Sequence, residues 1–215
     1  MRNLTDRIDD IKSMVSTTNQ NFKRSLDIIK EILTNSKFDP TLYGEAKSIE
    51  DAINHFETTV DEEVIKTIAR FQPMAINLRF LISVIKISMT VERMNDLCIN
   101  ILKVMKHSKS IKKYKNYNLL EMLEKVENMF ELFLKSYNEE NLSFSYLIIS
   151  LDEEVNAYKS AIIESLKNDT ILEKHELEVL FISQHLERIG DSIKNLAEIV
   201  VYIYNGIDIR HGISN

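Results

Sequence analysis

The chain contains very few of the residues that break regular structure. Among its 215 residues there are only 4 Gly and 2 Pro. Tight turns and strand connections draw heavily on these residue types, so a β-rich or α/β fold of this length would contain many more of them. Long helices need few connections. The sequence therefore predicts an all-α protein built from a few long helices.

Apolar residues follow the spacing of amphipathic helices. Across residues 4–33 they recur mostly every three or four residues, which places them on one face of a helix. Asp39 before Pro40 is a typical helix start, and Asn118 with Glu121 is typical of a capping box. The same spacing predicts five further helices, at about residues 40–72, 74–105, 118–137, 140–166 and 173–204.

Two segments of the chain match each other closely. Val91–Asn100 reads VERMNDLCIN and Leu186–Asn195 reads LERIGDSIKN, so Glu, Arg, Asp and Asn recur at the same spacings. These segments lie in the third and sixth predicted helices, with a lysine-rich linker between the two sets of three. An internal repeat of this kind indicates a duplicated structural unit. We expect six long helices that form two tandem three-helix bundles, at residues 1–108 and 116–215.

The composition excludes several classes of protein. A net charge of −6 disfavours nucleic-acid binding, which depends on an excess of Lys and Arg. Cys98 is the single cysteine, which excludes an intramolecular disulfide, and we expect it to be a small core residue. The first residues lack the apolar core of a signal peptide, and apolar stretches are shorter than the roughly 18 residues of a membrane span. We expect a cytoplasmic protein.

The linker between the two halves is strongly basic. Lys106–Lys115 contains five lysines. Charge runs of this kind usually mark a solvated connection. A docking patch for an acidic partner is the alternative interpretation.

The repeated motif places oxygen-bearing side chains on one face of each helix. A step of four residues returns to nearly the same face, with an offset of about 40°. Rows of carboxylate and amide oxygens suit hard cations such as Fe, Mn or Mg. We expect Glu50 on the second helix and Asp152 on the fifth to supply further oxygens. The candidate metal ligands from the motifs are Glu92, Asp96 and Asn100, and Glu187, Asp191 and Asn195.

The alternative interpretation of the motif is a set of ion pairs. Each carboxylate would then pair with Arg93, with Arg188 or with a lysine of a neighbouring helix. Helical bundles carry such pairs without any metal. The two interpretations stay open at this point.

Motifs of known enzymes are missing from the sequence. Ferritin-like di-iron enzymes use Glu-x-x-His on two helices, and none of the five histidines here has a glutamate three residues before it. There is also no Gly-rich phosphate loop, no H-E-x-x-H and no G-x-S-x-G. The sequence therefore shows none of these enzyme signatures, and a metal-dependent enzyme or metal store remains an alternative interpretation.

Several motifs together resemble the PhoU family of phosphate-uptake regulators. The family pattern is roughly Q-P-x-A-x-D-L-R, then E-R-I-G-D-x-x-x-N, repeated, with a closing G-x-D-x-R-H. Asn95 stands where the first copy of E-R-I-G-D has glycine, and Asn77 stands where D-L-R has aspartate. The second and fifth helices each keep only one of the family's two further acids. Besides the two E-R-x-x-D-x-x-x-N units, the matching residues are Gln72, Pro73, Ala75, Leu78, Arg79, Gly206, Asp208, Arg210 and His211.

The resemblance implies both a fold and a function. The fold would be two three-helix bundles packed side by side. The function would be that of a cytoplasmic, non-enzymatic negative regulator of phosphate uptake and phosphate-starvation signalling. The partners would be a phosphate ABC transporter and a sensor kinase, with peripheral membrane association through them, and we expect a homodimer. Some relatives hold iron clusters at such motifs, so iron or another divalent metal is the implied cofactor. The alternative function is a PhoU-like metal-binding regulator that gates a sodium–phosphate cotransporter or another ion channel.

Overall fold

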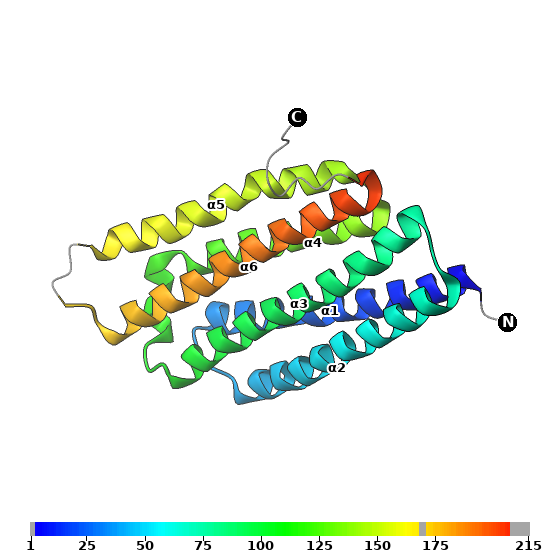
Figure 1. The fold of residues 1–215 in the computed structure, drawn as a ribbon. Helices are drawn as coiled ribbons and strands as arrows, with labels where there is room; N and C mark the ends of the chain where they lie inside the picture. The colour runs from blue at the N-terminus through cyan, green and yellow to red at the C-terminus, as the bar shows by residue number, and fades with distance from the viewer. Residues whose placement is uncertain (1–2, 168–170, 207–215) are drawn as a thin grey trace.

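The computed structural model describes residues 3–167 and 171–206, and helices are the only regular secondary structure within them (Figure 1). The prediction of an all-α protein with six long helices is confirmed for these residues. None of these helices combines the length and apolar content that crossing a membrane requires. The elements are α1 (Leu4–Asn35), α2 (Pro40–Phe71), α3 (Ala75–His107), the short 3₁₀ helix η1 (Ile111–Tyr117), α4 (Leu119–Glu139), α5 (Leu142–Leu166) and α6 (Lys174–Asn205).

The helices form two bundles that lie side by side. Helices α1, α2 and α3 pack on one another, as do α4, α5 and α6. The bundles join where α3 packs against α6 and where α1 packs against α4. Figure 1 shows α3 and α6 running in opposite directions along the middle of the molecule. The helices that carry the repeated motif are therefore neighbours.

A single apolar core runs through both bundles. Nearly all of the buried aliphatic and aromatic residues of the six α-helices belong to one continuous cluster. Phe22 of α1 and Phe130 of α4 meet edge to face across the boundary, with ring centroids 4.7 Å apart. Each fully buried large side chain contributes about 1.5–3 kcal/mol to folding. The division into domains at 1–108 and 116–215 stays a prediction, because the two units share this core.

The predicted helix start is confirmed at α2 and is wrong at α4, and α1 begins with a capping box that was not predicted. Asn3 and Asp6 form a capping box at the start of α1. At α2 the Asp39 side chain accepts a hydrogen bond from the Thr41 amide at 2.7 Å, with Pro40 as the first helical residue. The predicted capping box at Asn118 is wrong. Asn118 has a left-handed backbone (φ 51°), and its side chain makes no capping bond.

The basic linker is more structured than a solvated connection. Ile111 and Tyr114 of η1 are both buried, because a spacing of three places them on one face of a 3₁₀ helix. The Tyr114 hydroxyl donates to the Glu178 carboxylate of α6 at 2.8 Å, and the Ser108 hydroxyl donates to it at 2.6 Å. Burial raises the pKa of the Tyr114 hydroxyl. These bonds hold η1 against α6 while the lysines of the linker stay exposed.

The first and last signature motifs meet at one end of the central helix pair. Arg79, in the first turns of α3, donates from Nε to the backbone oxygen of Ile203 in the last turn of α6 at 3.1 Å. Gly206 then ends α6 with φ 72°. A Cβ on Gly206 would lie 3.4 Å from the Arg79 guanidinium. Cations bind well to the free carbonyls at a helix end, so this arginine caps α6. The other closing-motif residues, Asp208, Arg210 and His211, lie outside the described residues.

We expect this cap to stabilise the whole molecule. Arg79→Met removes a charged hydrogen bond and should lower the free energy of unfolding by about 1–2 kcal/mol. Gly206→Ala forces a left-handed backbone onto alanine and should cost about 1 kcal/mol. Chemical denaturation followed by circular dichroism measures both. Arg93→Met is the matched control, since the exposed Arg93 makes no ion pair with a described residue. Equal stability of the Arg79 and Arg93 variants would contradict the capping role.

Candidate functional site

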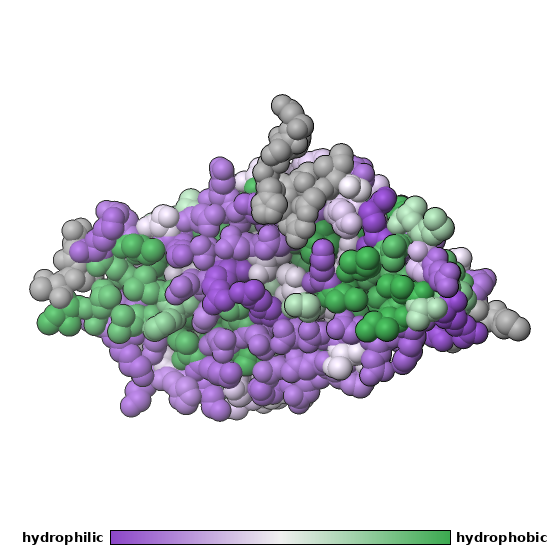
Figure 2. Space-filling model, viewed as in Figure 1, coloured by the Kyte–Doolittle hydropathy of each residue, from purple (hydrophilic) through white to green (hydrophobic). Residues whose placement is uncertain are grey.

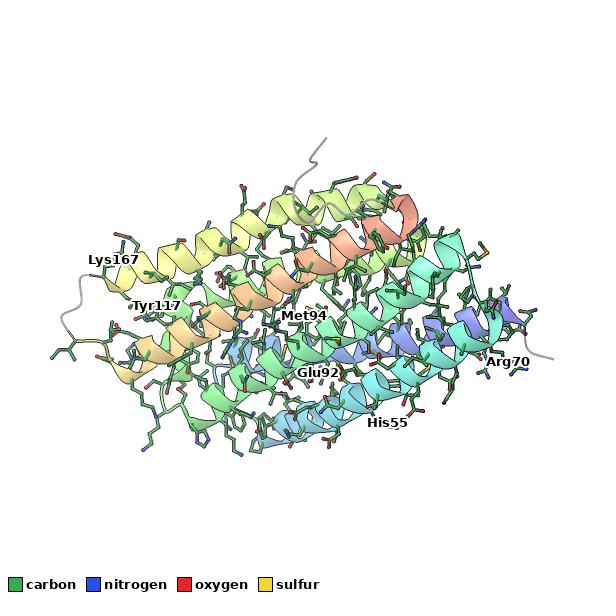
Figure 3. All side chains as sticks on the ribbon, in the orientation of Figure 1. His55, Arg70, Glu92, Met94, Tyr117 and Lys167 are labelled. Atoms are coloured by element: carbon green, nitrogen blue, oxygen red, sulfur yellow. The ribbon has the colours of Figure 1, made fainter. Side chains whose placement is uncertain are left out.

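The motif on α3 lies beside the acidic face of α2. Glu92 is half-buried near the middle of α3, on the side of α2 (Figure 3). Burial raises the pKa of the Glu92 carboxyl, and the negative charges of Asp96, Glu57 and Glu50 raise it further. The structure therefore brings together four acids, of which Glu50 is paired with Lys47. We refer to Glu50, Glu57, Glu92 and Asp96 as the α3 acidic cluster.

Glu57 is the member of this cluster that the sequence analysis missed. It follows Glu50 by seven residues, or about two helical turns, so both lie on the same face of α2. That spacing is a signal the sequence contains. In the family pattern the second acid instead lies within one turn of the first, and this position is not acidic here.

The motif on α6 has a different electrostatic setting. Burial raises the pKa of Asp191, and the nearby carboxylates of Asp152 and Glu187 raise it further. Two lysines oppose this effect. Lys194 donates to the buried Asp152 carboxylate at 2.9 Å, and Lys159 of α5 pairs with Glu187 at 3.1 Å. The α6 acidic cluster, Asp152, Glu187 and Asp191, is thus largely neutralised by the protein itself.

The asparagines and arginines of the two motifs make few contacts with the acidic clusters. Asn100 accepts a hydrogen bond from Lys103 at 3.3 Å, and Asn195 is exposed. Arg93 and Arg188 are exposed and make no ion pair with any carboxylate in the described part of the chain. The expectation that these arginines neutralise the motif is wrong for those residues. The expectation of a lysine from a neighbouring helix is confirmed for Glu187.

These acids do not fit a metal centre as the structure arranges them. Within residues 3–167 and 171–206, no three His, Cys, Asp or Glu side chains converge closely enough to hold a metal ion. A cation at the α6 cluster would also have to displace two lysine ammonium groups. Binding of iron or another divalent metal at the predicted ligands stays a prediction.

One of the differences between the two motifs, Gly190 in α6 against Asn95 in α3, has a packing explanation. Gly190 of α6 is buried, and a Cβ there would lie 3.4 Å from a Val155 methyl group of α5. The matching Asn95 of α3 is also buried, and its side-chain oxygen accepts a hydrogen bond from the Ser25 hydroxyl of α1 at 2.7 Å. The first bundle therefore accommodates a buried polar side chain at this position, whereas in the second a Cβ would already be in van der Waals contact with α5.

The protein therefore belongs to the class of helical proteins built from two repeated three-helix bundles, with an acidic cluster beside α3 and another beside α6. Both repeats match one family of known proteins. A sequence model described as the PhoU domain matches residues 11–105 and again 119–200. The chain belongs to the PhoU family.

Curated relatives and solved structures agree with this assignment. The phosphate-specific transport system accessory protein PhoU homolog of Pseudomonas aeruginosa is 27% identical, over 80% of this chain and 74% of that protein. PhoU homolog 1 of Thermotoga maritima is 25% identical, over 97% of this chain and 90% of that protein. Crystal structures of PhoU from P. aeruginosa and from Streptococcus pneumoniae each give a TM-score of 0.83, at 21% and 22% identity, and cover 95% and 96% of this chain and 100% and 99% of those chains. The structures establish the same fold.

We expect Glu92→Gln to stabilise the protein at neutral pH. The pKa of Glu92 is raised in the folded state, so folded protein binds this proton more tightly than unfolded protein does. The contribution of Glu92 to the free energy of unfolding is therefore fully present at pH values below the ordinary carboxyl pKa. It is lost as the pH rises through the raised pKa of the folded state. Gln cannot ionise, and removing one like-charge i,i+4 pair should add about 0.2–0.5 kcal/mol above that window. Urea denaturation in the presence of a chelator, at neutral and at acidic pH, measures the gain.

The outcome also tests for a metal. At acidic pH the variant and the parent protein should be equally stable. A loss of stability in Glu92→Gln that is seen only without chelator would mean that a cation sits in the α3 acidic cluster. Metal content after chelator-free purification, compared between the parent and Glu92→Ala with Asp96→Ala, gives the direct readout.

Proposed function

We propose that this protein is an accessory protein of a phosphate-specific transport system and acts in the cytoplasm as a negative regulator of phosphate uptake. The observation that carries the proposal is the family membership, because both halves of the chain match the PhoU domain. Relatives that are named as such accessory proteins align over most of their own length. The proposed partners are the phosphate ABC transporter and its sensor kinase, and the proposed form is a homodimer attached to the membrane only through these partners.

The proposed mode of action is binding, without a catalytic step. Cys98, the one thiol of the chain, is fully buried, and burial raises its pKa, so a reactive thiolate is not presented to a substrate. His185 is half-buried, and burial together with the charge of Arg188 lowers its pKa. Regulation would then consist of a change in affinity for the transporter or the kinase.

The face made by α3 and α6 offers a surface for such binding. Figure 2 shows two hydrophobic areas on this view of the molecule, with a hydrophilic band between them. Exposed apolar side chains include Ile82 and Met89 on α3 and Leu177 and Phe181 on α6. Met89 and Phe181 are each 55% exposed, which is unusual for large apolar residues and is typical of protein contact sites. We propose this α3–α6 face as the docking surface.

Deletion of the gene should switch on phosphate-scavenging genes although phosphate is plentiful. A negative regulator holds these genes off, so its loss releases them. Transcript levels of such genes in phosphate-rich medium, with the deletion complemented in trans, provide the measurement. Unchanged transcript levels would refute the regulatory role for this protein.

Met89→Ser with Phe181→Ser should weaken binding to the partner by tenfold or more, because buried apolar anchors contribute about 2 kcal/mol or more each. Affinity purification from the native host, followed by identification of the retained proteins, measures the loss. Ile65→Ser is the matched control, since Ile65 is an apolar residue of α2 that is 62% exposed. If the parent protein, the double variant and the Ile65→Ser control all retained the partner equally, the α3–α6 face would be ruled out as the docking surface. Capture of a sodium–phosphate cotransporter or an ion channel, with no ABC transporter, would support the alternative function instead.

A further inference from the structure

One end of the molecule is hollowed between the α1–α2 turn and the basic linker. A pocket of about 460 Å³ is lined by Ser36, Lys37 and Phe38 of the turn and by residues 108–113 of the linker. A second hollow of about 300 Å³ shares Lys37 and Phe38 with it and extends along Pro40 and Leu42. We refer to the larger hollow as the basic pocket.

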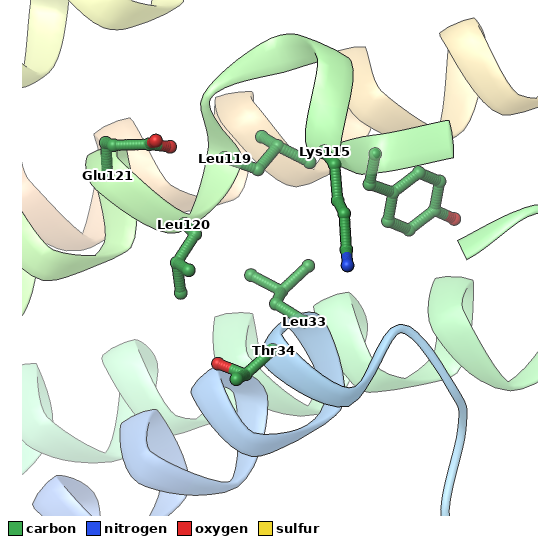
Figure 4. A pocket seen from close by; sticks show the side chains of 7 residues that line it. Leu33, Thr34, Lys115, Leu119, Leu120 and Glu121 are labelled. Atoms are coloured by element: carbon green, nitrogen blue, oxygen red, sulfur yellow. The ribbon is translucent and has the colours of Figure 1, made fainter. Parts of the chain in front are cut away.

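Positive charge is concentrated at this end of an acidic protein. The stretch 97–120 contains six lysines and no Asp or Glu, although the whole chain carries a net charge of −6. Four lysines line the basic pocket, namely Lys37, Lys109, Lys112 and Lys113. On another side of η1, the Lys115 ammonium extends towards the end of α1 in a hollow of about 380 Å³ (Figure 4).

The acids near the pocket are already engaged. Glu173 pairs with Lys113 at 2.7 Å, and Asp39 at the edge of the second hollow caps α2. Glu178 is buried beneath the linker and accepts the hydrogen bonds from Ser108 and Tyr114 described above. In contrast, Lys37, Lys109 and Lys112 are exposed and have no carboxylate partner within residues 3–167 and 171–206.

The pocket walls are held in place before any ligand arrives. The linker is fixed to α6 through Glu178 and to the core through Ile111 and Tyr114. On the turn, the half-buried Phe38 ring lies 5.8 Å from the Tyr43 ring, and Lys106 covers Tyr43 at 4.6 Å. A preformed site loses less conformational entropy on binding than a mobile one.

We propose that the basic pocket binds a compact anion with several phosphoryl groups, such as the triphosphate of a nucleotide. Lys37, Lys109 and Lys112 would contact the phosphoryl oxygens, because lysine ammonium groups bind phosphate as point charges. Three unpaired cations around one concave site repel one another, and an anion with multiple charges relieves this repulsion. The pocket volume exceeds the size of a single phosphate ion.

A macromolecular anion fits these observations less well. The acidic remainder of the protein would be repelled by an acidic lipid surface, and an acidic peptide would need an extended surface instead of a pocket. The second hollow gives a reason to test nucleotides, since Phe38, Pro40 and Leu42 provide an apolar surface for a base beside Lys37. An inorganic oligophosphate carries the same phosphoryl chemistry without a base.

Calorimetric titration of the full chain with ATP and with tripolyphosphate tests the proposal. The triple variant Lys37→Gln, Lys109→Gln, Lys112→Gln should bind both anions at least about tenfold more weakly than the parent, because each charged hydrogen bond contributes about 1.5–3 kcal/mol. The control variant Lys12→Gln, Lys86→Gln, Lys135→Gln loses the same charge near the opposite end and should retain binding within about threefold. Circular dichroism verifies that both variants fold.

Two results support the proposal and distinguish the source of the anion. Tighter binding of ATP than of tripolyphosphate, reduced to equality by Phe38→Ala, assigns a nucleotide, and equal binding assigns an oligophosphate. The proposal is overturned if the parent protein binds neither anion, or if the pocket and control variants lose binding equally. Displacement of ATP by polyglutamate at equal charge concentration would overturn it in favour of an acidic peptide. None of these results depends on the regulatory function proposed above.

Discussion

The contact between α3 and α6 is the constraint on which the rest of the molecule depends. Each bundle leaves one helix whose apolar surface its own two partners do not cover completely. Packing these two helices against each other buries that surface and merges the bundles into one core. Met94 and Ile189, at matching positions of the repeat, are both completely buried. Because core residues occupy the remaining faces, the polar residues of the motifs can only lie at the margins of this helix pair.

The sequence allowed the helices to be predicted well, because long amphipathic periods and scarce turn residues leave few alternatives. The errors lie where local conformation depends on distant contacts. Asn118 looks like an ordinary N-cap, yet its backbone is left-handed, and it directly follows a 3₁₀ helix whose Ile111 and Tyr114 are buried in the core. The linker sequence suggested an exposed, charged connection because its five lysines outnumber the two buried residues, Ile111 and Tyr114. Only the fold reveals the Glu178 carboxylate to which the Tyr114 hydroxyl donates.

The candidate site was predictable in its residues and less so in its electrostatics. Matching carboxylates in a repeat indicated where acids gather, and Glu92 and Asp191 do have raised pKa values from burial and from their acidic neighbours. The sequence did not indicate which lysines neutralise these carboxylates. Lys159 and Lys194 reach the α6 cluster because α5 and α6 pack closely, whereas the α3 cluster has Lys47 alone among the ion pairs described. Two copies of one motif have thus acquired unequal charge balance.

The cap formed by Arg79 on the end of α6 makes the two repeats dependent on each other. The last turn of the second repeat is completed by a side chain of the first, and the linker between them is held by a carboxylate of the second. A gene split at the linker would therefore yield two halves, each with an exposed apolar helix and an incomplete terminus. The first half would lack the Glu178 carboxylate that anchors the linker, and the second half would lack the arginine that caps α6.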